Sequence, residues 1–209
     1  MKPSGQIPDF YDDLGLSFDK AWDIIEPGAK KRTSPAHTPV VGTVDSSGHP
    51  QIRVMVLRSA DRSNRLLRFH TDARSIKVAE IGHGCAASVL MYDPEEKLQL
   101  RLNGTVSIAA GGSDVDAAWS KSTTFARRCY LAEAAPGAAS DRPTSGLPEW
   151  IEGKQPVEAD LAAARQNFAV LWFETHGLEW LYLANSGHRR ARWEWQSVTK
   201  TWSGRWLIP

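Results

Sequence analysis

Residues 51–77 read QIRVMVLRSADRSNRLLRFHTDARSIK, and the prediction of the fold starts from this stretch. Its first part, residues 53–58, has the spacing of a β-strand, with Arg53 and Arg58 pointing to opposite faces beside apolar groups. A polar turn separates it from a second strand at residues 66–71, after which a helix begins. The stretch therefore predicts two strands and a helix start with cationic side chains at their ends.

The first turn of this predicted helix carries the cations Arg74 and Lys77 on either side of Ser75. Free backbone N–H groups and the positive end of the helix dipole attract anions there, whereas cations in a first turn oppose the dipole. This placement indicates a phosphate site. From spacing alone, ordinary solvated charges explain it equally well.

Composition restricts the class of protein. The chain has 209 residues, 42% hydrophobic and 23% charged, with a formal net charge of +1, as expected for one globular domain over residues 1–209. The low net charge argues against a nucleic-acid partner. No apolar run is long enough to span a membrane and no signal-peptide core follows the N-terminus, so we expect a cytoplasmic protein. Cys85 and Cys129 lack metal-ligand spacing, and no metal is expected.

Hydrophobic periodicity predicts the remaining elements. Strands are expected at residues 40–44, 51–58, 66–71, 85–92, 98–108, 168–173, 178–184, 190–196 and 201–208. Helices are expected at residues 17–25, 74–81, 111–128 and 157–165, with an N-terminal extension over residues 1–15 and a long loop over residues 130–155.

Short hairpins join several of these strands in sequence. They predict a mainly β protein with flanking helices, in which an antiparallel sheet curls into a barrel because closure removes exposed edges. A parallel dinucleotide-binding sheet is disfavoured, since neither GxGxxG nor a phosphate-binding P-loop occurs. In the strand at residues 98–108, Gln99, Arg101 and Asn103 alternate with leucines, so one face is polar and either meets water or lines a wet site.

Five segments in a fixed order resemble the pyridoxamine 5'-phosphate oxidase superfamily, and within it the Alr4036-type branch. They are RVMVLR (53–58), FHT (69–71), RSIK (74–77), LQLRLNG (98–104) and a C-terminal pair, RAR (190–192) and WLIP (206–209). The resemblance extends from about residue 15 to the last residue. It implies an antiparallel split β-barrel that forms a homodimer with FMN bound at the subunit interface.

The resemblance also implies which residues contact the cofactor. The set is Arg53, Val54, Met55, Val56, Leu57, Arg58, His70, Thr71, Arg74, Ser75, Lys77, Gln99, Tyr182 and Arg192.

The resemblance implies that Arg53, Ser75 and Lys77 contact the phosphate. Ile76 stands where the oxidases often have arginine, and the neighbouring Arg74 is expected to supply that charge. The backbone following Arg53 lies near the flavin ring. His70 and Thr71 replace a Tyr-Thr pair beside the flavin. Gln99 comes from the partner subunit, while Tyr182 and Arg192 lie near the ring.

The C-terminal motif departs from that of the true oxidases. The true oxidases have Arg-x-His-x-Arg, whereas this chain has His188-Arg189-Arg190-Ala191-Arg192. His188 thus stands where the oxidases have their first arginine, and Arg190 stands where they have histidine. His188 and Arg190 are therefore candidate substrate contacts, but the substrate is not expected to be pyridoxamine phosphate.

Flavin carries hydride and electron transfer itself, so the absence of an obvious acid–base pair is consistent with a flavoprotein. The leading hypothesis is an FMN-dependent oxidoreductase with an unknown small-molecule substrate and no assigned catalytic residue. The alternative is a flavin-binding protein without turnover that serves storage or sensing.

Overall fold

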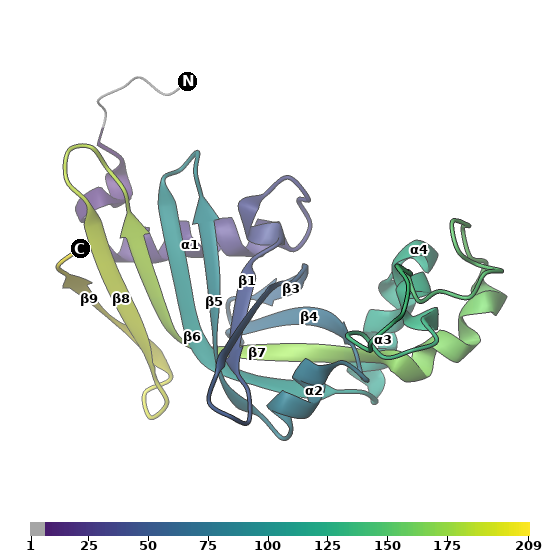
Figure 1. The fold of residues 1–209 in the computed structure, drawn as a ribbon. Helices are drawn as coiled ribbons and strands as arrows, with labels where there is room; N and C mark the ends of the chain where they lie inside the picture. The colour runs from purple at the N-terminus through teal and green to yellow at the C-terminus, as the bar shows by residue number, and fades with distance from the viewer. Residues whose placement is uncertain (1–6) are drawn as a thin grey trace.

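A computed structural model describes residues 7–209, and over these residues the chain forms a nine-stranded antiparallel sheet with helices on one face and at one end (Figure 1). Of the predicted N-terminal extension, residues 1–6 lie outside the described residues. The remainder forms the short 3-10 helix η1 and the start of the first α-helix.

The strands are β1 (Val40–Val44), β2 (Pro50–Val54), β3 (Leu57–Asp61), β4 (Leu66–Asp72), β5 (Cys85–Asp93), β6 (Leu98–Ala109), β7 (Phe168–Tyr182), β8 (Arg189–Gln196) and β9 (Thr201–Leu207). The helices are α1 (Leu14–Gly28), α2 (Ile76–Ile81), α3 (Ser113–Lys121) and α4 (Thr124–Arg127). The 3-10 helices are η1 (Asp9–Asp12), η2 (Pro35–His37), η3 (Arg128–Leu131) and η4 (Glu158–Asn167).

The longest strand, β7, divides the sheet. One edge of β7 pairs with β6, while its other edge pairs with β4 along the first half and with β8 along the second half. The main path runs β2-β1-β5-β6-β7-β4-β3, and the sheet does not close into a complete ring. The prediction of a mainly β, antiparallel split barrel with flanking helices is confirmed.

The single strand predicted across residues 51–58 is wrong. β2 ends at Val54 and pairs with β1, whereas β3 begins at Leu57 and pairs with β4 at the other end of the sheet path. Met55 and Val56 cross between these two edges, and the Met55 N–H donates to the carbonyl of Pro39 at 3.0 Å. Met55 and Val56 continue the alternation of the strand in the sequence, so the sequence does not show that the chain leaves β1 and pairs with β4 after them.

The two strands predicted at residues 168–173 and 178–184 are also wrong as separate elements, because β7 is continuous. The irregularity is one extra residue in β7: Asn103 and Gly104 of β6 pair with Gly177 and Thr175, so His176 has no partner on β6. A Cβ atom at Gly104 would overlap the main-chain carbonyl of Glu174, so glycine allows the two backbones to approach closely there.

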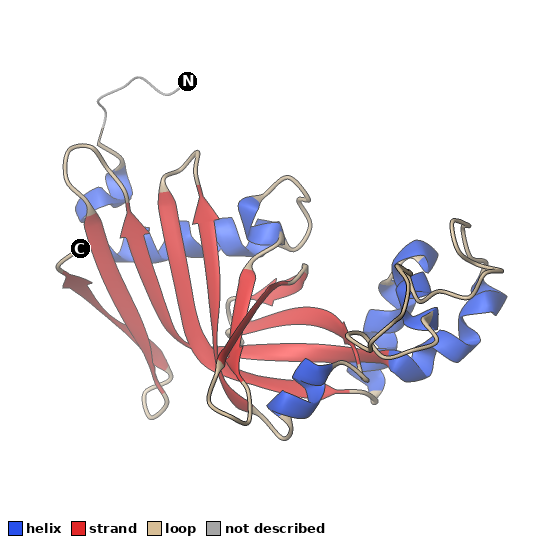
Figure 2. Ribbon diagram, viewed as in Figure 1, coloured by secondary structure: helices blue, strands red, loops and turns tan. Residues whose placement is uncertain are grey.

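Residues 113–167, called the helical arm below, extend beyond the first half of β7 (Figure 2). The one helix predicted at residues 111–128 is two, since Thr123 caps α4 by accepting from the N–H of Ala126 at 3.2 Å. The helix predicted at 157–165 is the 3-10 helix η4. The arm packs on the start of β7 through an apolar cluster that joins its Trp119 and Tyr130 to Phe168.

Helix α1 covers one face of the sheet, and its Ala21, Trp22 and Ile25 are completely buried. It is longer than the predicted helix at residues 17–25 and begins where the Asp13 carboxylate accepts from the N–H of Leu16 at 2.8 Å. The main core, with Trp180 and Trp193, lies beneath this helix. Within residues 7–209, no helix combines the length and the apolar character that crossing a membrane requires.

Candidate functional site

A cavity of about 1430 Å³ lies where the end of β2, β4 and α2 meet the helical arm. Its lining contains eight Lys and Arg side chains and one carboxylate, Asp72. The cations are Lys30, Arg32, Arg53, Arg58, Arg68, Lys77, Lys121 and Arg128. Such an imbalance favours an anionic ligand.

Arg53, Thr71 and Lys77 line one side of this cavity, and together with Ser75, buried beside them, they form what we call the cradle. The Lys77 ammonium donates to Thr71 Oγ1 at 3.3 Å and to Ser75 Oγ at 3.1 Å. Ser75 directly precedes α2 and is buried, as is Thr71 at the end of β4. The segment from β4 to α2 therefore holds two hydroxyls and an ammonium together.

Arg53 enters the cradle from β2. Its Nη1 donates to Thr43 Oγ1 at 2.6 Å, and its Nη2 lies 3.7 Å from a carboxylate oxygen of Glu80. Burial, and then the Arg53 charge, lower the pKa of Lys77, while Asp72 and Glu80 oppose this shift. Two cations held close together in a partly buried site would be stabilised by a phosphate dianion, so the donor set fits that group.

Arg74 is not brought into the cradle. Its guanidinium makes two hydrogen bonds to the Asp72 carboxylate, at 3.0 and 2.8 Å, and one to the carbonyl of Ala132 at 2.9 Å. The hydrogen bonds to Asp72 raise the pKa of Arg74. Arg74 therefore ties the end of β4 to the loop that follows η3, and it does not line the cavity.

The crossing from β2 to β3 forms one wall of the cavity. Val54, Met55, Val56 and Arg58 line it, whereas Leu57 is completely buried in the core. Because Met55 and Val56 belong to neither strand, a flat ligand could lie along this wall beside the cradle.

His70 lines the cavity next to Thr71, and its ring meets Phe168 edge-on with centroids 4.8 Å apart. Burial, followed by the charges of Arg58 and Arg68, lowers the pKa of His70 to about 3. Its Nε2 is buried without a hydrogen-bond partner. The imidazole is therefore neutral at ordinary pH, with one ring nitrogen that can donate a hydrogen bond to a ligand and one that can accept.

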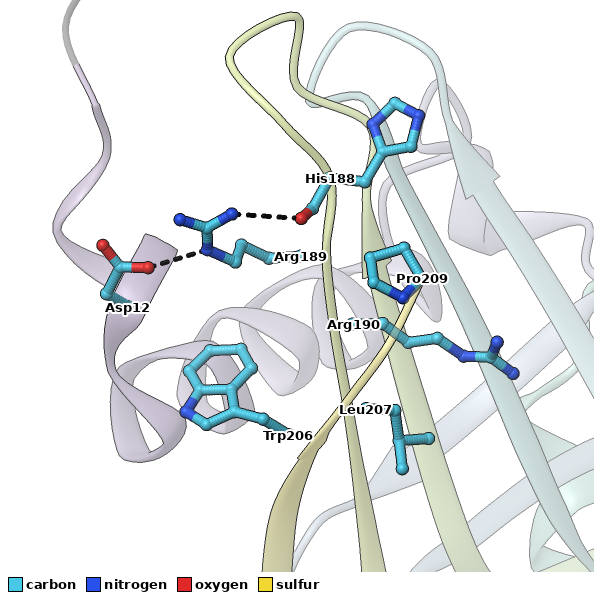
Figure 3. Close-up of a pocket in the computed structure, with 7 residues that line it drawn as sticks. All are labelled: Asp12, His188, Arg189, Arg190, Trp206, Leu207 and Pro209. Carbon is cyan, nitrogen blue, oxygen red and sulfur yellow. Dashed lines mark hydrogen bonds and ion pairs between the residues drawn. The ribbon is translucent and has the colours of Figure 1, made fainter.

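The other predicted contacts lie elsewhere in the chain. Gln99, Tyr182 and Arg192 are on the half of the sheet formed by β6, β8 and the second half of β7, and they do not line the large cavity. His188 and Arg190 line a separate cavity of about 350 Å³ near the C-terminus (Figure 3). One chain thus brings together most of the predicted residues between Arg53 and Lys77, except Leu57 and Arg74, and it separates them from Gln99, Tyr182, His188, Arg190 and Arg192.

Gln99 and Arg192 lie on a broad sheet surface, which we call the open face, whereas the ring of Tyr182 packs on the opposite face against Phe10 and Tyr11. Residues aligned across β2, β5 and β6 point away from α1, and Ile52, Val54 and Tyr92 are 76%, 64% and 49% exposed there. Beside them, the buried Glu179 carboxylate accepts from Arg190 at 2.9 Å and lies 3.5 Å from Arg101. Apolar side chains next to an ion-pair network are typical of a protein interface.

Sequence reasoning missed several contributors to the large cavity, among them Arg68, Arg128 and Tyr130. Arg68 shares a face of β4 with His70, so the alternation of that strand could have identified it. Tyr130 and Arg128 come from the helical arm, and no local pattern connects them with residues more than fifty positions earlier. Among residues 7–209, no group of three His, Cys, Asp or Glu side chains is arranged to hold a metal ion.

Comparison with known proteins connects this geometry with a family. Residues 20–110 match the profile described as pyridoxamine 5'-phosphate oxidase, FMN-binding domain. All four cradle residues lie within the matched segment. No curated protein sequence is similar enough to this chain to count as a match.

Solved structures share the fold over nearly the whole chain. A pyridoxamine 5'-phosphate oxidase-related FMN-binding protein from Nostoc punctiforme has a TM-score of 0.72 at 19% identity, covering 98% of this chain and 100% of that one. PhzG from Burkholderia lata, solved with tetrahydrophenazine-1-carboxylic acid, has a TM-score of 0.71 at 22% identity, covering 98% of each chain. The Alr4036-type branch is not distinguished by these matches and stays a prediction. Residues 20–110 are thus similar to the FMN-binding domain of pyridoxamine 5'-phosphate oxidases, and the chain shares its fold with proteins related to them.

Proposed function

We propose that this protein is an FMN-dependent oxidoreductase that acts on a small organic molecule as a homodimer. The observation that carries the proposal is the cradle, in which Arg53 and Lys77 adjoin two buried hydroxyls at the edge of a large cationic cavity. A phosphate dianion matches these donors in charge and hydrogen bonding.

Arg53, Ser75 and Lys77 would hold the phosphate, and the wall formed by Met55 and Val56 would align the flavin ring. Bound FMN supplies hydride and electron transfer, so the chain needs to provide binding, orientation and electrostatics. The neutral imidazole of His70 offers a hydrogen-bonding group on the cavity wall without adding positive charge.

The open face supports the homodimer. In a symmetric dimer the same patch appears on both subunits, and burial of Ile52 and Tyr92 against their copies would remove apolar surface from water. The partner could then bring Gln99 and Arg192 to the flavin, and its Arg190 and His188 toward the substrate, whereas Tyr182 packs against the core of its own chain. This arrangement accounts for the separation of the predicted residues into two groups within one chain.

The test begins with FMN itself. Purified protein is titrated with FMN while flavin fluorescence is followed, and its mass is measured by light scattering with and without FMN. The proposal expects saturable binding of one FMN per chain and a dimeric mass. A protein that does not bind FMN would contradict it.

Turnover is tested on the FMN-loaded protein under anaerobic conditions. NADPH is added, bleaching of the flavin absorbance is recorded, and candidate oxidants are then introduced to restore the colour. Reduction and reoxidation support an oxidoreductase. Tight FMN binding with no reduction by any donor would instead favour a flavin-binding protein that serves storage or sensing, and in either case we expect the protein in the cytoplasm.

A further inference from the structure

A carboxylate lies directly behind the cradle, next to the cations that would bind a phosphate. Glu80 follows Lys77 by three residues in α2, so the two side chains leave the same side of the helix. The Glu80 side chain is 13% exposed, and its Oε2 lies 3.7 Å from Nη2 of Arg53. A buried carboxylate this close to an anion site requires an explanation, because it would repel a bound phosphate.

The protein contacts of Glu80 point toward the two cations. Within residues 7–209, its Oε2 is buried and accepts no hydrogen bond, and the 3.7 Å contact with Arg53 is an ion pair that is too long for a hydrogen bond. Burial and the Arg53 charge lower the pKa of Lys77, whereas Asp72 and Glu80 raise it. Glu80 therefore attracts Arg53 and favours the charged form of Lys77.

The guanidinium of Arg53 is held from two directions. From β1, Thr43 lies diagonally across from Arg53 and accepts a hydrogen bond from its Nη1 at 2.6 Å. From α2, Glu80 faces the other terminal nitrogen, Nη2. An arginine side chain has several rotatable bonds and five N–H donors in one plane. Contacts at both terminal nitrogens restrict that plane, and a contact at Thr43 alone would leave it freer to turn.

We propose that Glu80 is a positioning residue for the flavin phosphate: together with Thr43, its carboxylate fixes the Arg53 guanidinium at the cavity wall before FMN binds. The inference rests on the proposed function, because it assumes that Arg53 contacts the FMN phosphate. A donor that is already held in place loses less conformational freedom when the ligand arrives, and this favours binding.

Glu80 has a second effect of opposite sign. Its charge lowers the net charge of the cradle, so by simple electrostatics its removal would strengthen the binding of an anion. Its hold on Arg53 predicts instead that removal weakens binding. Since Arg53 lines the cavity and Glu80 does not, a ligand meets the guanidinium first. We therefore expect positioning to exceed repulsion, and the sign of the change in FMN affinity distinguishes the two effects.

The experiment titrates FMN into purified protein and follows flavin fluorescence. Glu80→Gln keeps the shape of the side chain and removes its charge, whereas Glu80→Asp keeps the charge and withdraws the carboxylate from Arg53. Each is made in the wild type and in Arg53→Ala. Asp23→Asn, which removes an exposed carboxylate on α1, is the control. Thermal unfolding without FMN is recorded for every variant, and Glu80→Asp decides the question if Glu80→Gln does not fold.

We expect Glu80→Gln to weaken FMN binding by about tenfold and Glu80→Asp by about threefold or more, while Asp23→Asn leaves it unchanged. In the Arg53→Ala protein, Glu80→Gln should either change the affinity by less than about twofold or strengthen binding, because no guanidinium is left to position. General damage to α2 would not produce this dependence on Arg53.

Two results would overturn the inference. If Glu80→Gln and Glu80→Asp bind FMN as tightly as the wild type or more tightly, the carboxylate does not position a phosphate ligand. If they weaken binding equally with and without Arg53, Glu80 supports α2 and not the guanidinium. In both cases the wild type still binds FMN and the proposed function stands. Failure of the wild type to bind FMN is the separate result that rejects the proposed function and this inference with it.

Discussion

The two halves of β7 carry different kinds of surface. The first half pairs with β4 and borders the large cavity, in which one chain assembles the cradle beside Arg58, Arg68 and His70. The second half pairs with β8 and borders the open face, which leaves large apolar side chains in water. In the function proposed above, the first surface would hold the FMN phosphate with residues of one chain, and the second would bring residues of a second copy to the rest of the cofactor.

The two halves meet at the irregularity opposite Gly104, and replacing this residue should have the largest effect. Gly104→Ala places a methyl group against the Glu174 carbonyl, so strand pairing must separate locally. We expect the free energy of unfolding to fall by about 3 kcal/mol. Urea denaturation measures it, with Gly111→Ala as the control because a Cβ there meets no atom within 4 Å. Equal stability of the two variants would contradict the close approach.

A charged substitution tests whether the open face is the dimer contact. Tyr92→Glu places a carboxylate on both copies of a symmetric contact, and we expect the dimer dissociation constant to rise by about a hundredfold. Sedimentation over a range of concentrations measures the change. Val198→Glu is the control, since Val198 is 93% exposed in the turn between β8 and β9. Unaltered assembly of the Tyr92 variant would place the dimer contact elsewhere.

The cradle can be weakened without disturbing the open face. Lys77→Ala and Arg53→Ala each remove a charged donor and should weaken FMN binding by about 1.5–3 kcal/mol. Lys31→Ala removes an exposed lysine and should have no effect. Fluorescence titration compares the three, and unchanged affinity of both cradle variants would reject the phosphate assignment.

Lowering the pH should reduce the free energy of unfolding through His70, which lines the large cavity. Its pKa is about 3 in the folded protein against 6.5 for an ordinary histidine, so the unfolded chain binds the extra proton between these values. Stability contributed by neutral His70 is present above pH 6.5 and declines as the pH falls toward 3. Between pH 7 and pH 5, the wild type should lose about 1–2 kcal/mol more than His70→Gln. Urea unfolding at both pH values provides the measurement, and parallel losses would show that His70 is not buried as described.

Much of the fold could be predicted from local signals. The turn at Asp45–Pro50 and that at Asp93–Lys97 mark hairpins, and the antiparallel sheet follows from them. The cradle could be predicted because Ser75 and Lys77 are close in sequence at a helix start, so their proximity does not depend on tertiary structure.

Other features depend on partners that the sequence does not identify. Nothing local to Thr175–Gly177 reveals that β6 keeps pairing there, and the result is one strand where two were predicted. Arg74 has the sequence context of a phosphate ligand, yet Asp72 lies two residues away and binds its guanidinium. Arg58 and Arg68 are brought together by the pairing of β3 with β4, which hydrophobic spacing alone does not describe.

β7 is a single strand of 15 residues, about 46 Å long, and it continues through the register shift at His176 between its two halves. Its amides should therefore exchange with solvent deuterium as one cooperative unit, since opening one end removes support from the other. A ligand that stabilises the cavity would slow exchange in the second half of the strand as well, far from any atom it touches.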